Sequence, residues 1–298
     1  MSWFNYHTHC NYCDGKYPAE EYVLAAINKG FFSLGFSSHF PLPFSAKFAM
    51  AEERLADYLA QIESLCNKYA CKIDIYTGAE VDYIPEQRTV KDAAVQAAEL
   101  DYTIGSIHFV DSFFDGTPWQ VDGRHLEFLR GLKDIFHYDI QQAVRRYYAL
   151  TREMIKQTQP TIIGHLDKIK VQNWDNQFFD ERERWYHNEV MATLETIQKY
   201  GGILEVNTRG IYKRKALTTF PSPWILEIAL DLDIPVTLSC DAHHPDELKL
   251  EFKKTAAMLR DLGYQTLQVL SNGAWVEAEF DSLGIKGQQH FTSSRIVA

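Results

Sequence analysis

Two histidines separated by one residue, His7 and His9, close a short apolar and aromatic run near the start of the chain. In an extended strand the side chains of residues i and i+2 lie on one face, whereas on a helix they diverge. The pair can therefore direct two imidazoles at one point only if the segment is extended, an arrangement typical of metal ligands. Taken alone, the motif also fits two unrelated histidines near a terminus, because short motifs match often by chance.

Further ligand-type residues follow apolar runs along the chain, so that six predicted strands each end in a histidine or a carboxylate. A single histidine at a strand end is more often a packing or surface residue than a ligand. Six such ends on one face are difficult to obtain by packing alone, and we interpret them as a metal site at the C-terminal ends of the strands. The candidates are His7, His9, His39, Glu80, His108, His165, Asp241 and His243, with Asp14 shortly after the first strand.

The size of this set indicates more than one metal ion. One catalytic ion usually takes three or four protein ligands, so we expect two or three divalent ions. Imidazole and carboxylate ligands suit Zn, Fe or Mn, and the sequence does not choose among them.

The elements that must position these residues alternate between strand and helix. After the first strand, apolar runs predict strands over 32–39, 72–80, 102–108, 161–165, 203–207, 234–243 and 266–270. Helical spacing of apolar residues, with Pro or acids at the starts and Gly at several ends, predicts helices over 18–30, 51–69, 87–100, 139–158, 180–200, 223–232 and 245–262.

This alternation of strands and helices predicts an α/β fold with a parallel sheet. A barrel is favoured over an open sheet because polar residues end nearly every strand, whereas an open sheet concentrates its site at one switch point. We find no linker and predict a single domain over 1–298. Residues 109–138 break the rhythm and predict an insertion over the barrel mouth, and the Gly- and Ser-rich residues 283–298 predict a peripheral tail.

Composition excludes several classes of protein. The net charge of −10 disfavours a nucleic-acid surface, which binds phosphates mainly through Lys and Arg. We recognise no signal segment and no apolar run near the length of a membrane span, and the five cysteines lack a regular framework, so we expect a cytoplasmic protein without membrane partners. Cys10 and Cys13 form a CxxC pair that we interpret as incidental, because it opens no helix and lacks a second CxxC. The oligomeric state is not readable.

The ordered set resembles the polymerase and histidinol phosphatase (PHP) family, over roughly residues 5–272. It is similar to the histidinol-phosphatase branch in the motifs His7-Thr8-His9, Asp14-Gly15-Lys16-Tyr17, Gly105-Ser106-Ile107-His108-Phe109, Glu205-Val206-Asn207-Thr208 and Asp241-Ala242-His243, and in Trp119 and Asp122 of the insertion. The resemblance implies a distorted (β/α)7 TIM-like barrel, with the strand at 266–270 outside the barrel proper.

The resemblance also implies a trinuclear site. One ion would be held by His7, His9, Glu80 and Asp241, and Glu80 would bridge to a second ion bound by His108 and His165. The third ion would be held by Asp14, His39 and His243. Many relatives have a histidine at the place of Asp14, but a carboxylate binds the same ions.

The implied activity is that of a metal-dependent phosphomonoesterase. The expected reaction is hydrolysis of L-histidinol phosphate to L-histidinol and phosphate in histidine biosynthesis, with metal-activated hydroxide attacking phosphorus in line. Among the catalytic residues, Glu80 would bridge ions. Asp241 or His243 would manage the proton of the leaving alkoxide, or a metal ion would stabilise this alkoxide directly.

Substrate contacts are predicted from two groups of residues. Arg209, Lys213 and Arg214 follow the sixth strand and are candidates to bind the phosphate, although they also fit a solvated basic loop. The imidazole and amine of the substrate need acids and aromatics, for which the candidates are Trp119, Asp122 and His244.

Three alternatives remain open. Other PHP phosphoesterases act on phosphotyrosine proteins or phosphodiesters, but the acidic charge disfavours a nuclease and the long insertion disfavours an open protein-binding mouth. Barrel amidohydrolases also begin with two histidines in this spacing, but they usually carry a bridging carboxylated lysine, and no predicted strand ends in Lys. A metal-storing module would not need a shaped pocket.

Overall fold

The computed structural model describes residues 2–287, and seven parallel strands form its centre. Each strand pairs in parallel with the next strand along the sheet. In spatial order they are β1 (Trp3–Asn5), β2 (Phe31–Phe36), β3 (Asp74–Asp82), β4 (Tyr102–Ser106), β7 (Ile162–Ile163), β8 (Ile203–Asn207) and β9 (Val236–Ser239). The predicted (β/α) barrel of seven strands is confirmed.

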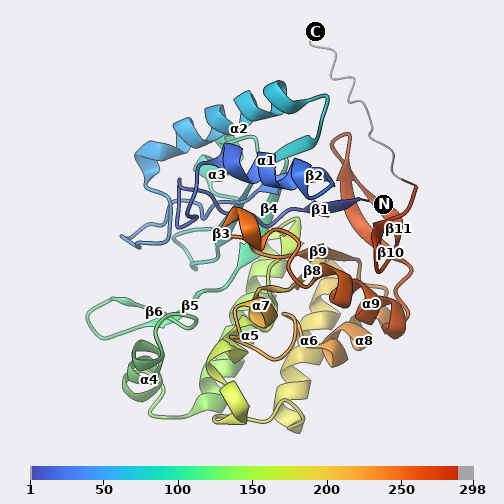
Figure 1. Cartoon of the computed structure of the whole chain (residues 1–298). Helices are drawn as coiled ribbons and strands as arrows, with labels where there is room; N and C mark the ends of the chain where they lie inside the picture. The colour runs from blue at the N-terminus through green and yellow to red at the C-terminus, as the bar shows by residue number, and fades with distance from the viewer. Residues whose placement is uncertain (1, 288–298) are drawn as a thin grey trace.

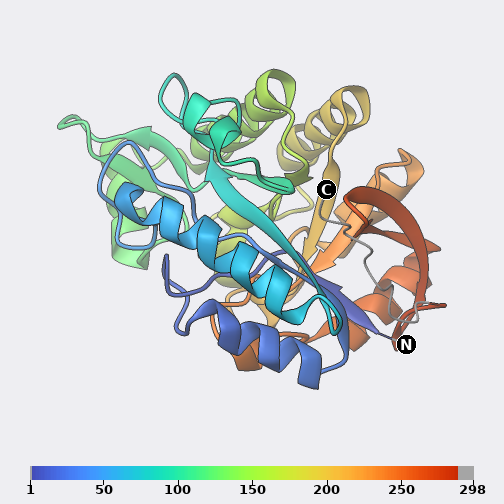
Figure 2. The ribbon, with the colours of Figure 1, turned by 90° about the horizontal axis from the view of Figure 1, so that it is seen from above.

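Helices surround the strands (Figures 1 and 2). Helices α1 and α2 lie side by side on one flank and α5 and α6 on another. No helix of the described residues is long and apolar enough to cross a membrane. The helices are α1 (Ala19–Asn28), α2 (Leu55–Tyr69), α3 (Ala93–Ala97), α4 (His125–Asp134), α5 (Ile140–Thr158), α6 (Arg184–Tyr200), α7 (Arg209–Tyr212), α8 (Pro223–Asp231) and α9 (Phe252–Leu262).

The barrel closes where the extended residues after β1 meet those after β9. Thr8 forms a parallel bridge with Ala242, in which the backbone N–H of His9 donates to the Ala242 carbonyl at 2.8 Å. The side chain of Asn5 reinforces this contact, because its Oδ1 accepts a hydrogen bond from the backbone N–H of Cys240 at 2.9 Å. The first and last strands of the barrel are thereby joined at the end that carries the predicted ligands.

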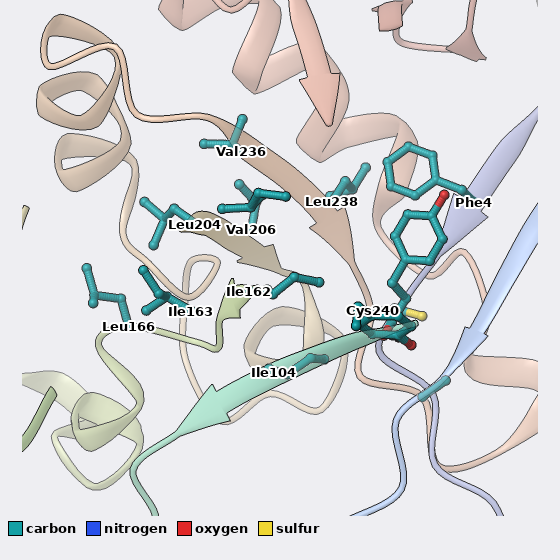
Figure 3. Close-up of a cluster of buried hydrophobic side chains, with 14 of the residues drawn as sticks. Phe4, Ile104, Ile162, Ile163, Leu166, Leu204, Val206, Val236, Leu238 and Cys240 are labelled. Atoms are coloured by element: carbon teal, nitrogen blue, oxygen red, sulfur yellow. Dashed lines mark hydrogen bonds between the residues drawn. The ribbon is translucent and has the colours of Figure 1, made fainter. Parts of the chain in front are cut away.

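The core lies between the strands and the helices around them. Strands β2 and β8 are buried along their whole length, as expected for parallel strands covered on both faces. Each fully buried aliphatic side chain stabilises the fold by roughly 1.5–3 kcal/mol relative to an exposed one. Figure 3 shows part of this core, formed by Ile162 and Ile163 of β7, Leu204 and Val206 of β8, and Val236 and Leu238 of β9.

Three elements differ from the prediction for local reasons. Strand β9 ends at Ser239 because Asp241 has a left-handed backbone with φ of 51°. Helix α3 is shorter than predicted because Ile84 pairs with Arg88 across a turn that precedes it. The helix predicted over 245–262 divides into a 3₁₀ turn, Pro245–Glu247, and α9, because Glu251 also has positive φ.

The insertion contains a hairpin of β5 (Phe109–Ser112) and β6 (Pro118–Gln120), followed by α4. The hairpin and α4 project beside the barrel (Figure 1). Outside the barrel, β10 (Thr266–Ser271), β11 (Ala274–Asp281) and β12 (Gly284–Ile285) form an antiparallel sheet, as the resemblance implied for the strand at 266–270. Within the predicted tail over 283–298, Ile285 is buried in β12, and residues 288–298 lie outside the described residues.

The side chain of Tyr102 fills the space between β2 and β3. Its hydroxyl donates to the carbonyl oxygen of Tyr6 at 2.6 Å and lies 3.1 Å from that of Phe36. A Cβ atom at Gly35 or Gly78 would lie only 2.4 Å from the Tyr102 side chain, so glycine is required at both positions.

We predict that Tyr102→Phe lowers the free energy of unfolding by about 1–3 kcal/mol, because the buried carbonyls lose their hydroxyl donor. Urea unfolding monitored by circular dichroism tests this, and Tyr138→Phe is the control because Tyr138 is 65% exposed. Equal stability of the Tyr102 and Tyr138 variants would contradict a structural role for the buried hydroxyl.

Candidate metal centre

The structure brings all nine predicted ligands together at the C-terminal end of the barrel. Except for Asp14, they are buried, although every one of them is polar. Within each of three groups, the ligand atoms lie within 4.8 Å of one another. The groups are His7, His9 and Asp241; His39, Glu80 and His108; and His9, Asp14, His39 and His243.

Glu80 lies at the centre of the cluster, with its two carboxylate oxygens facing different histidines. Its Oε1 lies 2.9 Å from Nε2 of His165 and 3.6 Å from Nε2 of His108. Its Oε2 faces the opposite side, where the nearest ring nitrogens, 3.1–3.4 Å away, belong to His7, His9 and His39. This arrangement suits a carboxylate shared between two metal ions.

The grouping differs in detail from the predicted one. His9 belongs to two of the groups, and His39 lies near Glu80 as well as near Asp14. His165 joins the cluster through its contact with Glu80. Metal ions held by these overlapping groups would share ligands such as His9 and His39.

The ring nitrogens and carboxylate oxygens that face one another in this cluster are suitable metal ligands. The Nε2 atom of His9 is buried and has no hydrogen-bond partner among residues 2–287, although carboxylate oxygens of Glu80 and Asp241 lie 3.4 and 3.5 Å away. A buried polar atom without a partner is costly, and a bound cation would satisfy it together with both carboxylates. The buried His and carboxylate groups therefore suit a multinuclear metal site.

Carboxylates behind the cluster orient two of its histidines. Glu205 of β8 accepts from Nδ1 of His7 at 2.5 Å, and Asp82 of β3 accepts from Nδ1 of His108 at 2.8 Å. Such contacts fix the tautomer of a ligating histidine and leave Nε2 for the metal. The sequence prediction missed both roles, although Asp82 shares a strand face with Glu80 at the spacing i+2.

The charges of the cluster are strongly coupled. Although burial opposes a charge on either imidazole, Glu205 and Asp241 raise the pKa of His7 well above its usual value, and Asp82 raises that of His108 to about 10. Burial also opposes ionisation of Glu80, but the surrounding histidines hold the pKa of its carboxyl well below the usual range.

A cavity of about 170 Å³ opens onto the cluster, and three cations line it. Lys168 lies 3.7 Å from carboxylate oxygens of both Asp122 and Asp241. Arg209 donates to the Asp241 carbonyl oxygen at 2.6 Å. Lys215 lines the same cavity, and no carboxylate of the described chain lies within ion-pair distance of its Nζ.

Only one of the three cations predicted to bind phosphate lines this cavity. Arg209 does so, whereas Lys213 forms an ion pair with Glu247 and Arg214 is exposed. The prediction missed Lys168 and Lys215. Lys215 belongs to the same basic loop, so residue type identified the segment but not the side chains that face the cavity.

Of the three residues predicted to contact the leaving group, only one lines the cavity. Asp122 lines the cavity, together with Gln120 and Phe48. Trp119 is instead 1% exposed and packs inside the insertion against Phe128, at a ring distance of 5.4 Å.

His244, the third residue predicted to contact the leaving group, is not among the residues that line the cavity. It stands beside Tyr17, at a ring distance of 4.7 Å. Neither Trp119 nor His244 is therefore placed by the structure to touch a molecule in the cavity.

The chain is therefore a parallel α/β barrel with a cluster of side chains at its mouth that suits more than one metal ion. The model of the PHP domain matches residues 5–209, and the chain belongs to this family. It is a PHP-family phosphoesterase.

Sequence similarity to known proteins extends over most of the chain. A probable histidinol-phosphatase of Deinococcus radiodurans is 27% identical over 265 residues, covering 87% of this chain and 92% of the relative. The histidinol-phosphatase of Bacillus subtilis is 26% identical over 253 residues, covering 81% and 94%.

A solved structure confirms the fold. The histidinol phosphate phosphatase of Lactococcus lactis, complexed with zinc, L-histidinol and phosphate, aligns with a TM-score of 0.69 at 20% identity. The alignment covers 96% of this chain and 99% of that one.

We predict that loading the metal-free protein with zinc near neutral pH releases protons, because nearby carboxylates raise the pKa of His7 and of His108, and both rings must be neutral to bind the metal. His9, His39 and His165 have lowered pKa values, chiefly through burial, and are already neutral. Affinity should therefore fall as the pH is lowered.

Calorimetric titration in buffers of different ionisation enthalpy measures this release. In Asp82→Asn the pKa of His108 should be lower, so fewer protons should be released than from the parent protein. Binding without proton release would contradict this account of the cluster.

Proposed function

We propose that this protein hydrolyses L-histidinol phosphate to L-histidinol and phosphate, as a step of histidine biosynthesis. The observation that carries the proposal is one small cavity lined by seven of the nine candidate metal ligands, by three cations and by Asp122. The relatives named histidinol-phosphatase, which are similar over most of the chain, support it.

The metal ions are proposed to number two or three, of Zn, Fe or Mn. The nine cluster residues would hold them, with Glu80 as the shared ligand. When bound, such ions lower the pKa of a coordinated water to near neutral and offset the charge of phosphoryl oxygens.

The three cations of the cavity are proposed to bind the phosphate. Lys168, Arg209 and Lys215 approach the cavity from two loops, after β7 and β8. Arg209 is held in place by Asp241 and Tyr212, so its guanidinium is already ordered for the contact. Charge-assisted hydrogen bonds of this kind bind phosphate oxygens strongly.

Proton transfer is assigned to Asp241 and His243. Burial opposes ionisation of Asp241, but His7, Arg209 and Lys168 hold the pKa of its carboxyl well below the usual range. An ionised carboxylate can accept the proton of the attacking water and return it to the leaving alkoxide. His243 is the second candidate because its Nδ1 lies 3.4 Å from Oδ1 of Asp241, next to the same site.

Asp122 is proposed to bind the amine or imidazole of the substrate. Neighbouring His108 and Lys168 overcome the effect of burial and lower the pKa of its carboxyl to about 2, so it is ionised. Gln120 donates to its Oδ1 at 2.9 Å and orients it. Phe48 offers an apolar face at the same cavity.

We predict that the zinc-loaded protein hydrolyses L-histidinol phosphate faster than other phosphate esters. Steady-state kinetics should compare it with phosphotyrosine peptides, simple phosphomonoesters and phosphodiesters, with metal content measured on the same preparation. Faster turnover of a phosphotyrosine peptide or a diester would overturn the assignment in favour of another PHP phosphoesterase activity.

We predict that Lys215→Ala lowers kcat/KM for the phosphomonoester by about 10- to 100-fold, because a hydrogen bond from a charged donor contributes about 1.5–3 kcal/mol. The matched control is Arg214→Ala, which removes an exposed cation of the same loop. Kinetics and metal content are measured for both, and equal losses would exclude a specific contact by Lys215.

A further inference from the structure

Three of the candidate histidine ligands have a hydrogen-bond acceptor at the ring nitrogen that points away from the cluster. That nitrogen must carry the proton, and a fixed acceptor for the proton keeps the ring in the right tautomer. The acceptor is Glu205 for His7 and Asp82 for His108. For His243, Nδ1 lies 3.1 Å from the backbone carbonyl oxygen of Asp241.

His9 differs from these three residues. Its Nε2 faces Glu80 and Asp241, and its Nδ1 lies 3.4 Å from the sulfur of Cys13. The other near acceptor, Oδ1 of Asp14, is 3.9 Å away and beyond normal hydrogen-bond distance.

We propose that the thiol of Cys13 is a positioning group of the metal centre, which accepts a hydrogen bond from Nδ1–H of His9 and so keeps Nε2 available to a metal ion. The inference depends on the proposed role of His9 as a ligand, and it does not depend on which phosphate ester is the substrate.

The hydrogen bonds around the thiol are consistent in direction. The sulfur of Cys13 accepts from His9, and its own S–H donates to the carbonyl oxygen of Cys10 at 3.6 Å. A thiol is both a weak donor and a weak acceptor, so it can serve both contacts at once.

A neutral acceptor suits this position better than a carboxylate. Asp14 follows Cys13 directly, and its carboxylate reaches into the cluster, 3.1 Å from Nε2 of His243. A second carboxylate at position 13 would place like charges side by side in a buried site. The thiol orients His9 without adding charge.

The backbone fixes the place of the thiol. Residues 10–14 form a tight turn in which the N–H of Cys13 donates to the carbonyl oxygen of Cys10 at 3.1 Å. At Gly15 an added Cβ would lie 2.4 Å from the His9 carbonyl oxygen, so the turn packs directly on the ligand segment. The N–H of Lys16 then donates to the carbonyl oxygen of His243 at 2.9 Å.

The two cysteines of the pair therefore have separate surroundings. The sulfur of Cys10 lies 3.4 Å from the hydroxyl of Ser38 and contacts no candidate ligand side chain in the described chain. The sequence analysis interpreted this pair as incidental; in the structure, Cys13 has a specific contact with His9 that the sequence motif did not reveal.

The test compares zinc retention by full-length, zinc-loaded variants. Cys13→Ala and Cys13→Val remove the acceptor, Cys13→Ser keeps one, and Cys10→Ala is the matched control. Release of zinc to a coloured chelator is followed in time, and thermal unfolding of each loaded variant checks the fold. Loss of a contact behind a ligand typically weakens metal binding by about 10- to 100-fold.

We expect Cys13→Ala and Cys13→Val to lose one class of zinc about tenfold or more faster than the parent, whereas Cys13→Ser and Cys10→Ala retain it. Equal retention by all variants, or a serine variant no better than alanine and valine, would overturn the proposal. Two acceptor-removing variants of different volume separate the lost hydrogen bond from a packing defect. Because zinc release uses no substrate, failure to hydrolyse L-histidinol phosphate leaves this test valid.

Discussion

The metal centre depends on one backbone contact, the pairing of Thr8 with Ala242 that closes the barrel. We call this pairing the barrel seam. Thr8 stands between His7 and His9, and Ala242 stands between Asp241 and His243, so the seam aligns the two ligand pairs. A shift of one residue in this pairing would turn one pair away from the other. The seam thus converts two short motifs, each common by itself, into one site.

The groups that face the buried carboxylates explain why their negative charges are tolerated. Glu80 and Asp241 are nearly inaccessible to water, and burying unpaired carboxylates is very costly. Each faces several imidazoles, and the cations Lys168 and Arg209 add positive charge at the mouth. Bound metal would complete this balance. The cluster therefore sets the charge of the cavity, which suits an anionic ester.

The strand-end ligands could be predicted from the sequence because parallel strands place their last side chains at the same end of the barrel. It did not separate Lys215 from Arg214, because the loop turns at Arg214, where φ is 55°, and no periodicity reports that turn. Trp119 was misplaced for a related reason: a tryptophan in an insertion is equally suited to a pocket wall and to the core of the insertion. Partners such as Asp82 have no recognisable spacing from the histidines they orient, since they lie on other strands of the barrel.

The barrel seam also has a consequence for the synthesis of the protein. The segment with His7 leaves the ribosome early, whereas Asp241 and the seam residue Ala242 are made only after most of the barrel. Until β9 docks beside β1, the early histidines belong to an open edge and form incomplete sites that compete poorly for scarce ions. A full set of candidate ligands therefore exists only after β9 has been made and docked, so a metal ion that needs the complete site would bind late in the synthesis of the chain.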